Sequence, residues 1–452
     1  MVLHRYLRSA LKWLAPGMGI KRWLLLLACG IALLSLGFSF LLRQLYPLPG
    51  IFYYLTLQLI PRGLRAGLFG LGGVVAVVVA LIRLNQTLLE PFVEPDPEVV
   101  ANAVYYHRQR ERGPKIVAIG GGHGLSALLR GLKQYTSNIT AIVTVADDGG
   151  SSGRLRRELG VLPPGDFRNC IAALADDEAL TTQLFQYRFP STSLRTDLST
   201  KFTPSDAEGL GARGNGSGLD GHSFGNLFIT AMAEVTGSFE RAILESGHVL
   251  AVQGRVLPST LHDVTLMADL RTKPVNRDGV SPSVRVTGES SITETGGTIE
   301  RIYLEPDNAP AYPDAVHALL EADLIAAGPG SLYTSILPNL LVPDVAQAVA
   351  ASRALKVYIC NIATQRGETD GYAVSDHVTA LEAHVGTGLF PTMLANDNLD
   401  VGLDTSPGVE LVRVDLPPNA GYQLITKDLV DPAHPWRHDS DKLARALMQL
   451  VE

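Results

Sequence analysis

The chain has 452 residues, of which 46% are hydrophobic and 18% are charged, and its net charge is -7. A chain of this length and apolar content is not disordered, and it can bury a large core. The acidic balance and the lack of a long Lys/Arg block argue against a dedicated nucleic-acid surface, which needs a concentrated basic footprint. Cys29, Cys170 and Cys360 are far apart in the sequence, which fits buried thiols in a reduced cytoplasmic protein.

Two uncharged runs lie near the start of the chain. Residues 23–42 are long enough to span a hydrocarbon core of about 30 Å, and residues 66–82 form a shorter, glycine-rich run. Basic residues gather before the first run and after the second, which predicts that both ends are cytoplasmic. We therefore expect a membrane anchor of two transmembrane helices over 1–89, in the cytoplasmic membrane. The alternative is a helical hairpin buried inside a soluble protein. A polar linker over 90–112 and a cytoplasmic domain over 113–452 would follow.

The large domain opens with "KIVAIGGGHGLSALLRGL", residues 115–132, which predicts a strand, a glycine turn and an amphipathic helix. Gly121, Gly122 and Gly124 let the backbone approach a ligand closely, and the free N–H groups of the helix start can hold an anion. The G-x-G-x-x-G fingerprint fails at Leu125, and the lysine of a P-loop is missing. The loop is therefore either an anion site or a tight turn without a ligand.

Asp147 and Asp148 follow the next predicted strand, 138–146, at the end where open α/β sheets bind ligands. Asp147 is spaced from the glycine loop like the acid that binds a ribose hydroxyl in dinucleotide folds. The two carboxylates could instead hold Mg²⁺ together with substrate phosphates. The next residues suit phosphate oxygens, namely Ser151, Ser152 and Arg154. The alternative is an acidic helix cap followed by a solvated basic helix.

Further polar clusters stand beside apolar segments later in the chain, and each alone could be turn and capping chemistry. They contain Asp166, Arg168 and Asn169, then His222, Ser223 and Asn226, then Gly328, Gly330, Ser331 and Thr334, and last Asn361, Thr364, Gln365 and Glu368. Together they repeat one arrangement, in which polar loops follow strands, and in a parallel sheet such loops share one edge. The sequence therefore predicts a doubly wound, mostly parallel, Rossmann-like α/β domain.

Seven motifs between residues 115 and 398 resemble those of the YvcK-type proteins and their relatives, the CofD-like phospholactate transferases. They are "GGGHGLSALLRGLK", "VADDGGSSGRLR", "PPGDFRN", "GHSFGNL", "GRVLPST", "GPGSLYTSILPNLL" and "CNIATQRGETDGY". The YvcK-type branch is the more similar one, and the resemblance implies a nucleotide site at the loop edge. Members of that branch bind UDP-sugars, notably UDP-N-acetylglucosamine, and support cell-wall precursor supply and cell shape during gluconeogenic growth. A uridylyltransferase activity is also attached to the family.

The resemblance also implies roles for individual residues. Gly121, Gly122 and Gly124 would give a diphosphate room, and Asp147 or Asp148 would bind Mg²⁺ or ribose, as the catalytic pair if the protein is an enzyme. The groups expected to hold phosphate oxygens are Ser151, Ser152, Arg154, Ser331 and Thr334. Asn226 and Asn361 would read base or sugar amides, because Asn presents a donor and an acceptor together. Asp166, Asn169, Arg255 and Gly330 complete the predicted ligand site.

Two features depart from the family pattern. His123 stands where many relatives have threonine, so its imidazole either donates to the ligand or points to solvent. Residues 191–220 are rich in Gly and Ser, which predicts a flexible insertion.

Three functions remain open at this point. The protein could be a membrane-tethered UDP-sugar sensor that regulates a cell-envelope enzyme, an Mg²⁺-dependent uridylyl or phosphoryl transferase, or a scaffold with a vestigial nucleotide site. The protein partner and the oligomeric state, including a homo-oligomer, stay open as well.

Overall fold

The computed structural model describes residues 53–54, 57, 59–89, 109–176, 180–190, 218–272, 282–403, 408–416 and 421–451, together with positions 27, 29, 31 and 35. The chain divides into two compact units, Met1–Gln109 and Arg110–Glu452. In the first unit, helix α4 covers Arg62–Leu89. Most of the predicted linker, 90–108, and of the predicted flexible insertion, 191–217, lies outside the described residues.

The structure does not support the predicted membrane anchor. The first proposed span, 23–42, lies outside the described residues apart from four positions. The second, 66–82, falls in α4, which contains Gly63, Gly67, Gly70, Gly72 and Gly73, and glycine adds no apolar side chain. Across the part of the chain that the structure describes, no helix combines the length and the apolar character that crossing a bilayer requires. The prediction of a multi-pass protein of the cytoplasmic membrane is therefore wrong.

A seven-stranded sheet forms the centre of the second unit. In spatial order its strands are β10 (Gln423–Lys427), β9 (Thr392–Asn396), β8 (Leu355–Ile359), β7 (Leu324–Ala327), β1 (Ile116–Gly120), β2 (Ile139–Val143) and β3 (Arg255–Pro258). All neighbours pair in parallel. Strands β1, β2, β7 and β9 are buried along their whole length, as expected for apolar strands that helices cover on both faces. The predicted parallel α/β fold is confirmed.

The direction of winding reverses beside β1. The chain passes from β1 through β2 to β3, then returns to the other side of β1 as β7 and continues through β8, β9 and β10. In the register, Ile116 pairs with Ile139 of β2 on one side and with Leu324 of β7 on the other. Open α/β sheets bind ligands outside the carboxyl ends of the strands at such a reversal point.

The helices form two packed groups. One contains α6 (Gly122–Leu132), α8 (Gly165–Leu174) and α17 (Ser440–Val451), and the other contains α13 (Pro313–Glu321), α14 (Leu337–Leu340), α15 (Pro343–Ala351) and α16 (Val374–Val385). Right-handed crossovers place the two groups on opposite faces of the sheet, because the winding reverses at β1. Helix α6 buries a leucine stripe formed by Leu125, Leu128, Leu129 and Leu132.

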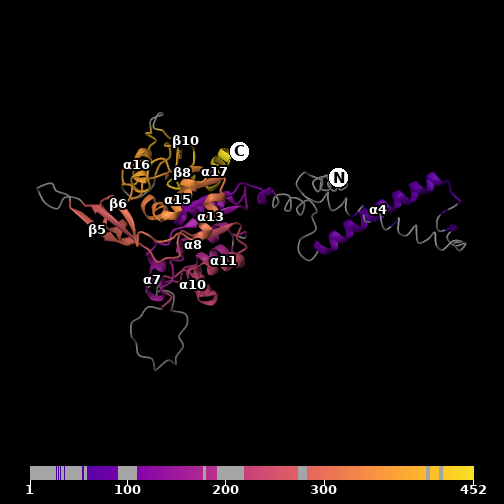
Figure 1. Ribbon diagram of the computed structural model, residues 1–452, viewed down its shortest axis with the longest axis horizontal. Coiled ribbons are helices and arrows are strands. Elements are labelled where there is room, and N and C mark those ends of the chain that lie inside the picture. The colour runs from indigo at the N-terminus through magenta and orange to yellow at the C-terminus, as the bar shows by residue number, and fades with distance from the viewer. Residues whose placement is uncertain are drawn as a thin grey trace, which may run out of the picture. The chain divides into compact units, whose positions relative to one another are not determined.

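Four further helices lie between β2 and β3 in the sequence. They are α7 (Gly150–Leu159), α9 (Leu180–Gln186), α10 (Phe224–Thr236) and α11 (Phe239–Val249). Figure 1 shows α7, α10 and α11 on the side of the unit away from α16 and β10. Helices α10 and α11 pack on each other, and α10 also contacts α7 and α8.

A small antiparallel sheet, which the sequence analysis did not predict, is inserted between β3 and β7. Its strands are β5 (Ser283–Thr287), β4 (Thr265–Arg271) and β6 (Thr298–Glu305) in spatial order, and helix α12 (Glu289–Thr295) connects β5 to β6. We call β4, β5, α12 and β6 the arm. Figure 1 shows β5 and β6 extending to one side of the α/β body. Leu266, Ile292 and Ile302 of the arm are buried in the same hydrophobic core as the central strands.

Candidate functional site

Two glycine-containing loops meet at the reversal point of the sheet. Residues 121–124 follow β1, and residues 328–331 follow β7. A Cβ atom on Gly124 would lie 2.5 Å from the backbone oxygen of Pro329, so a residue with a side chain cannot replace glycine here without a shift. Asn339 is fully buried and donates to the carbonyl oxygens of Gly120, at 3.0 Å, and Ser335, at 2.7 Å. These contacts hold the ends of β1 and β7 in one fixed relation.

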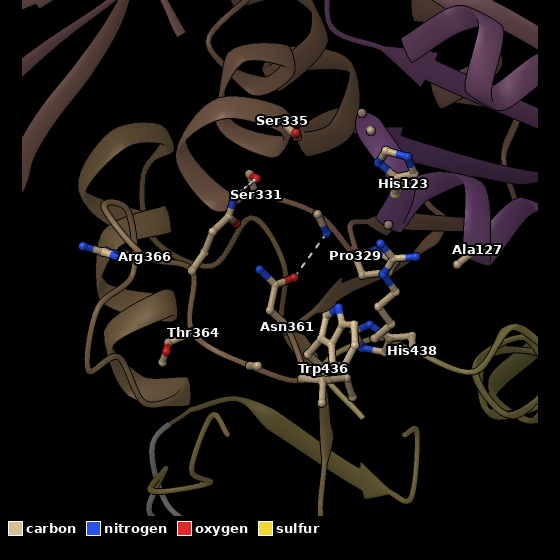
Figure 2. Close-up of a pocket in the computed structure, with 18 of the residues that line it drawn as sticks. His123, Ala127, Pro329, Ser331, Ser335, Asn361, Thr364, Arg366, Trp436 and His438 are labelled. Atoms are coloured by element: carbon tan, nitrogen blue, oxygen red, sulfur yellow. Dashed lines mark hydrogen bonds between the residues drawn. The ribbon is translucent and has the colours of Figure 1, made fainter. Parts of the chain in front are cut away.

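A pocket of about 830 Å³ opens at this junction (Figure 2). Its walls come from residues 121–124, Ala127, Asp147, Asp166, Glu289, 329–331, Ser335, 361–366, Val409 and 436–438. The volume lies within the range of small-molecule sites. The pocket therefore stands where a doubly wound sheet places its ligand.

One wall of the pocket offers backbone N–H groups and basic side chains. Helix α6 begins there at Gly122 without a side-chain cap, so its positive dipole end faces the pocket. His123 and Arg437 also line the pocket. Burial lowers the pKa of His123, and the positive charges of Arg437 and Arg168 lower it further. This wall is suited to an anionic ligand group.

A second wall carries amide and hydroxyl groups. The Oδ1 atom of Asn361 accepts a hydrogen bond from the N–H of Gly330 at 3.2 Å, which Figure 2 marks with a dashed line. Gln365 donates through Nε2 to the hydroxyl of Ser331 at 2.5 Å. In Figure 2 the side chain of Arg366 points away from these groups. The second glycine loop is thus held by side chains that themselves face the pocket.

A third wall is acidic and contains Asp147, Asp166 and Glu289. Burial and the neighbouring Asp147 carboxylate raise the pKa of Asp166 to about 7, although the N–H of Gly122 and the charge of Arg168 oppose this shift. Burial, the charges of Asp147 and Asp166, and a hydrogen bond with Asp147 raise the pKa of Glu289 far above its ordinary value. Glu289 therefore keeps its proton near neutral pH, which limits the negative charge of this wall.

The donor chemistry of the acidic wall fits a hard cation. Mg²⁺ is commonly held by one or two carboxylates together with substrate phosphates, and Asp147 and Asp166 could supply such oxygens. Within the described residues, no group of three or more His, Cys, Asp or Glu side chains is arranged to hold a metal ion. Any Mg²⁺ bound here would therefore take much of its coordination from a ligand or from water.

The structure separates the two adjacent aspartates that the sequence analysis treated as a pair. Asp147 lines the pocket, and its Oδ1 atom accepts a hydrogen bond from the N–H of Gly149 at 2.8 Å. Asp148 turns to the arm, where its Oδ1 atom accepts from the N–H of Ser290 at 3.0 Å. The two carboxylates thus serve different neighbours.

The predicted site residues as a whole fall into two groups, those that line the pocket and those that do not. Those that line the pocket are Gly121, Gly122, Gly124, Asp147, Asp166, Gly330, Ser331 and Asn361. Those outside its walls are Asp148, Ser151, Ser152, Arg154, Asn169, Asn226, Arg255 and Thr334. The ligand roles of both groups stay predictions.

Several residues outside the walls belong to a buried polar network between α7, α8 and α10. Asn226, which is 2% exposed, donates through Nδ2 to the hydroxyl of Ser151 at 3.1 Å and more weakly to that of Ser152. The hydroxyl of Ser151 also lies 2.9 Å from Nδ1 of His222. In the same region, Arg168 donates to Oδ1 of Asn169 at 2.8 Å. These hydrogen bonds link the three helices, although Oδ1 of Asn226 and Nε of Arg168 are buried without a partner among the described residues.

The remaining residues outside the walls have other partners. Arg154 donates to the carbonyl oxygen of Asp220 at 2.7 Å. Arg255 begins β3 and pairs with Thr140 near the start of β2, so it lies at the amino edge of the sheet, opposite the pocket. Thr334 donates to Oε1 of Glu368 at 3.1 Å. The fold thus places Arg255 at the edge of the sheet opposite the pocket.

Glu368 is a buried carboxyl group beside the second glycine loop. It is 4% exposed, and its Oε1 atom also accepts from Gln365 at 3.0 Å, whereas Oε2 has no partner. Burial raises the pKa of Glu368 to about 7, although the hydrogen bond from the Thr334 hydroxyl opposes the shift.

Sequence reasoning missed several pocket residues. Trp436, Arg437 and His438 come from a loop near the end of the chain, where "PWRHD" places an aromatic and a basic residue side by side behind a proline. This combination in the sequence could have indicated a ligand-binding loop. No local signal marks Glu289, because the packing of the arm alone brings it to the pocket.

Known proteins share this architecture. The family model described as "2-phospho-L-lactate transferase CofD" matches residues 116–452. A putative gluconeogenesis factor of Nostoc sp. is 44% identical over 463 residues, covering 97% of this chain and 92% of that protein. The gluconeogenesis factor of Bacillus subtilis is 43% identical over 75% of this chain and 98% of its own length. A crystal structure of a member of the UPF0052 family from Bacillus halodurans superposes with a TM-score of 0.62 at 40% identity, covering 75% of this chain and 99% of that one.

Proposed function

Because this chain belongs to the CofD family and to its gluconeogenesis-factor branch, we propose that its pocket binds a UDP-sugar, UDP-N-acetylglucosamine, and that binding regulates cell-wall precursor supply and cell shape. The regulated partner in this proposal is an enzyme of cell-envelope synthesis. The identity of the sugar and the regulatory role rest on the family resemblance.

The meeting of the two glycine loops carries this proposal. A diphosphate needs several hydrogen-bond donors with little bulk around them. The first turn of α6 offers backbone N–H groups beside the second glycine loop, although those of Gly122 and Gly330 are already bonded to Asp166 and Asn361. Arg437 in the same wall would neutralise part of the phosphate charge. The diphosphate would therefore lie against residues 121–124 and 329–331.

The other walls suit the two ends of a nucleotide sugar. Asn361 already uses Oδ1 to accept from Gly330, which leaves its amide N–H groups for a carbonyl oxygen of a base or of an acetamido group. Trp436 lines the same pocket and supplies an aromatic face for a planar base. A ligand with a base at one end and a sugar at the other would use both kinds of group.

A second function, Mg²⁺-dependent nucleotidyl or phosphoryl transfer, is favoured by the acidic wall. Asp147 and Asp166 are the residues that would hold the ion, which would supply charge neutralisation at the transferred phosphorus. Such transfer needs positioning and charge rather than a nucleophilic side chain. The glycine loops would hold the phosphates in line for the transfer.

A combined binding and turnover experiment tests both functions. Isothermal titration of the full chain with UDP-N-acetylglucosamine, with GDP-mannose as a base and sugar control, measures binding. Phosphorus NMR of the same sample with Mg²⁺ and pyrophosphate then detects UTP and sugar phosphate. Saturable binding without products supports the regulator, and products that disappear in Asp147→Asn support the transferase. Absence of binding by the wild-type chain would reject the UDP-sugar site.

A further inference from the structure

The arm brings a carboxyl group into the pocket. Among the described residues that line the pocket, Glu289 alone comes from the arm, where it is the first residue of α12. It stands in the acidic wall together with Asp147 and Asp166. A residue of the inserted sheet is therefore part of a pocket that the parallel sheet otherwise builds.

Asp148 fixes the position of Glu289. Its Oδ1 atom accepts from the N–H of Ser290 at 3.0 Å, which caps the first turn of α12. On the other side of Glu289, Gly288 has a φ of 96°, and a Cβ atom there would collide with Oδ2 of Asp148. The carboxylate of Asp148 thus touches both residues that flank Glu289.

Two other contacts hold α12 against the α/β body. Ile292 has no exposed surface and belongs to the hydrophobic core. A Cβ atom on Gly367 would lie 2.7 Å from the carbonyl oxygen of Thr293, so the loop that contains Gln365 packs directly on the helix. Helix α12 is therefore seated between the acidic wall and the loop after β8, with Glu289 at the pocket end.

We propose that Glu289 is a ligand-binding residue that exchanges hydrogen bonds with hydroxyl groups of the ligand's sugar, and that Asp148 is a positioning residue that acts through it. This inference rests on the proposed UDP-sugar site and assigns its sugar end to the arm. A neutral, hydroxyl-rich group suits an acidic wall, because a carboxyl group both accepts from and donates to hydroxyls. In the absence of a cation, a phosphate beside Glu289 would face the Asp147 carboxylate and would be repelled.

The test compares UDP-N-acetylglucosamine with UDP, which lacks the sugar. In isothermal titrations of the full chain, Glu289→Ala should weaken binding of the UDP-sugar about tenfold and change the affinity for UDP by less than about twofold. Glu289→Gln keeps a hydrogen-bond donor and an acceptor, so it should lose less affinity for the UDP-sugar than Glu289→Ala does. Glu294→Ala, an exposed position of the same helix, is the matched control and should bind both ligands as the wild type does.

A double-mutant cycle tests the role of Asp148. Asp148→Ala should weaken binding of the UDP-sugar nearly as much as Glu289→Ala, whereas Asp148→Asn, which keeps an acceptor for Ser290, should lose less. The double variant should bind no more weakly than Glu289→Ala alone, because Asp148 acts through Glu289. Thermal melts of each variant establish that it is folded.

The possible results separate a failure of the Glu289 assignment from a failure of the UDP-sugar site. If the wild-type chain does not bind UDP-N-acetylglucosamine, the proposed function fails and the sugar assignment fails with it. If the wild type binds and Glu289→Ala binds equally well, or loses UDP and the UDP-sugar alike, the role of Glu289 is wrong while the UDP-sugar site stands. Additive losses in the double variant would overturn the positioning role of Asp148.

Discussion

The Cα atom of Gly124 faces the backbone oxygen of Pro329 so closely that a Cβ atom would lie 2.5 Å from it. Replacing Gly124 by alanine should therefore separate the two glycine loops, because neither backbone can yield independently. We expect Gly124→Ala to lower the free energy of unfolding by about 1–3 kcal/mol, the usual cost of overpacking. Urea unfolding measures this loss, and titration with UDP-N-acetylglucosamine should show at least tenfold weaker binding.

Gly120 provides the matched control for that substitution. A Cβ atom on Gly120 would meet the side chain of Leu125 at 3.6 Å, an ordinary contact. Gly120→Ala should therefore change stability by less than about 1 kcal/mol. Equal losses in both variants would show that the approach of the two loops is not what constrains this region.

Asn361 should contribute more to ligand binding than to stability. Its Oδ1 atom accepts from Gly330 at 3.2 Å, and the loss of one such hydrogen bond costs about 1 kcal/mol. Asn361→Ala would also remove the amide donors that face the pocket, so we expect about tenfold weaker binding of the UDP-sugar by calorimetry. Asn398→Ala removes a similar side chain that bonds to Asp428 at an exposed site, and its binding should match the wild type.

Glu368 should make stability depend on pH. Burial raises its pKa to about 7 in the folded chain, from an ordinary value of 4.5. A raised carboxyl pKa favours the folded state fully below pH 4.5, and this contribution is lost as the pH rises through 7. The shift corresponds to about 3 kcal/mol. Glu368→Gln stays neutral, so relative to the wild type its free energy of unfolding should rise between pH 5 and pH 8.

Urea titrations at these two pH values check that expectation. Glu234→Gln, at an exposed position of α10, removes a carboxyl group without removing a buried one and should leave the pH dependence of the wild type intact. If Glu368→Gln retained the same pH dependence as the wild type, the carboxyl group of Glu368 would not be the source of it.

Replacement by alanine should change the stability of the chain in opposite directions at Gly131 and Gly247. A Cβ atom on Gly131 of α6 would collide with the backbone oxygen of Ser440, where α17 begins, whereas one on Gly247 of α11 would meet only Val252, at 3.7 Å. Gly131→Ala should therefore destabilise the chain by at least about 1–3 kcal/mol. Gly247→Ala should stabilise it by up to about 1 kcal/mol, because alanine is the better helix former. Thermal melting compares the two, and a stabilised Gly131→Ala would contradict the packing of α6 on α17.

The parts of the fold that the sequence predicts are those whose signals are local. The strand before Gly121, the glycine turn and the leucine stripe of α6 all lie within residues 115–132, so a short window contains the whole pattern. The clusters after β7 and β8 follow buried apolar strands in the same way. The edge that these loops share then follows from the topology of parallel sheets.

The parts that the sequence does not predict depend on long-range packing. Asp148 and Asp147 are chemically alike, and only the arm decides that Asp148 caps α12 while Asp147 faces the pocket. Arg255 stands in a motif-like segment, but the register of β3 puts it at the opposite edge. For the membrane anchor, apolar composition alone was given too much weight in a glycine-rich run.

The pairing of Ile116 with Leu324 has a consequence for how the chain is made. Strand β1 leaves the ribosome early, but one of its two neighbours, β7, emerges only after the arm has been synthesised. Until then one edge of β1 has no partner from the chain, and closing so long a loop is slow. The last wall of the pocket, residues 436–438, arrives later still. A nascent chain thus exposes an unpaired strand edge for a long interval. During that interval chaperones can bind the edge, whereas the pocket is still incomplete and cannot bind its ligand.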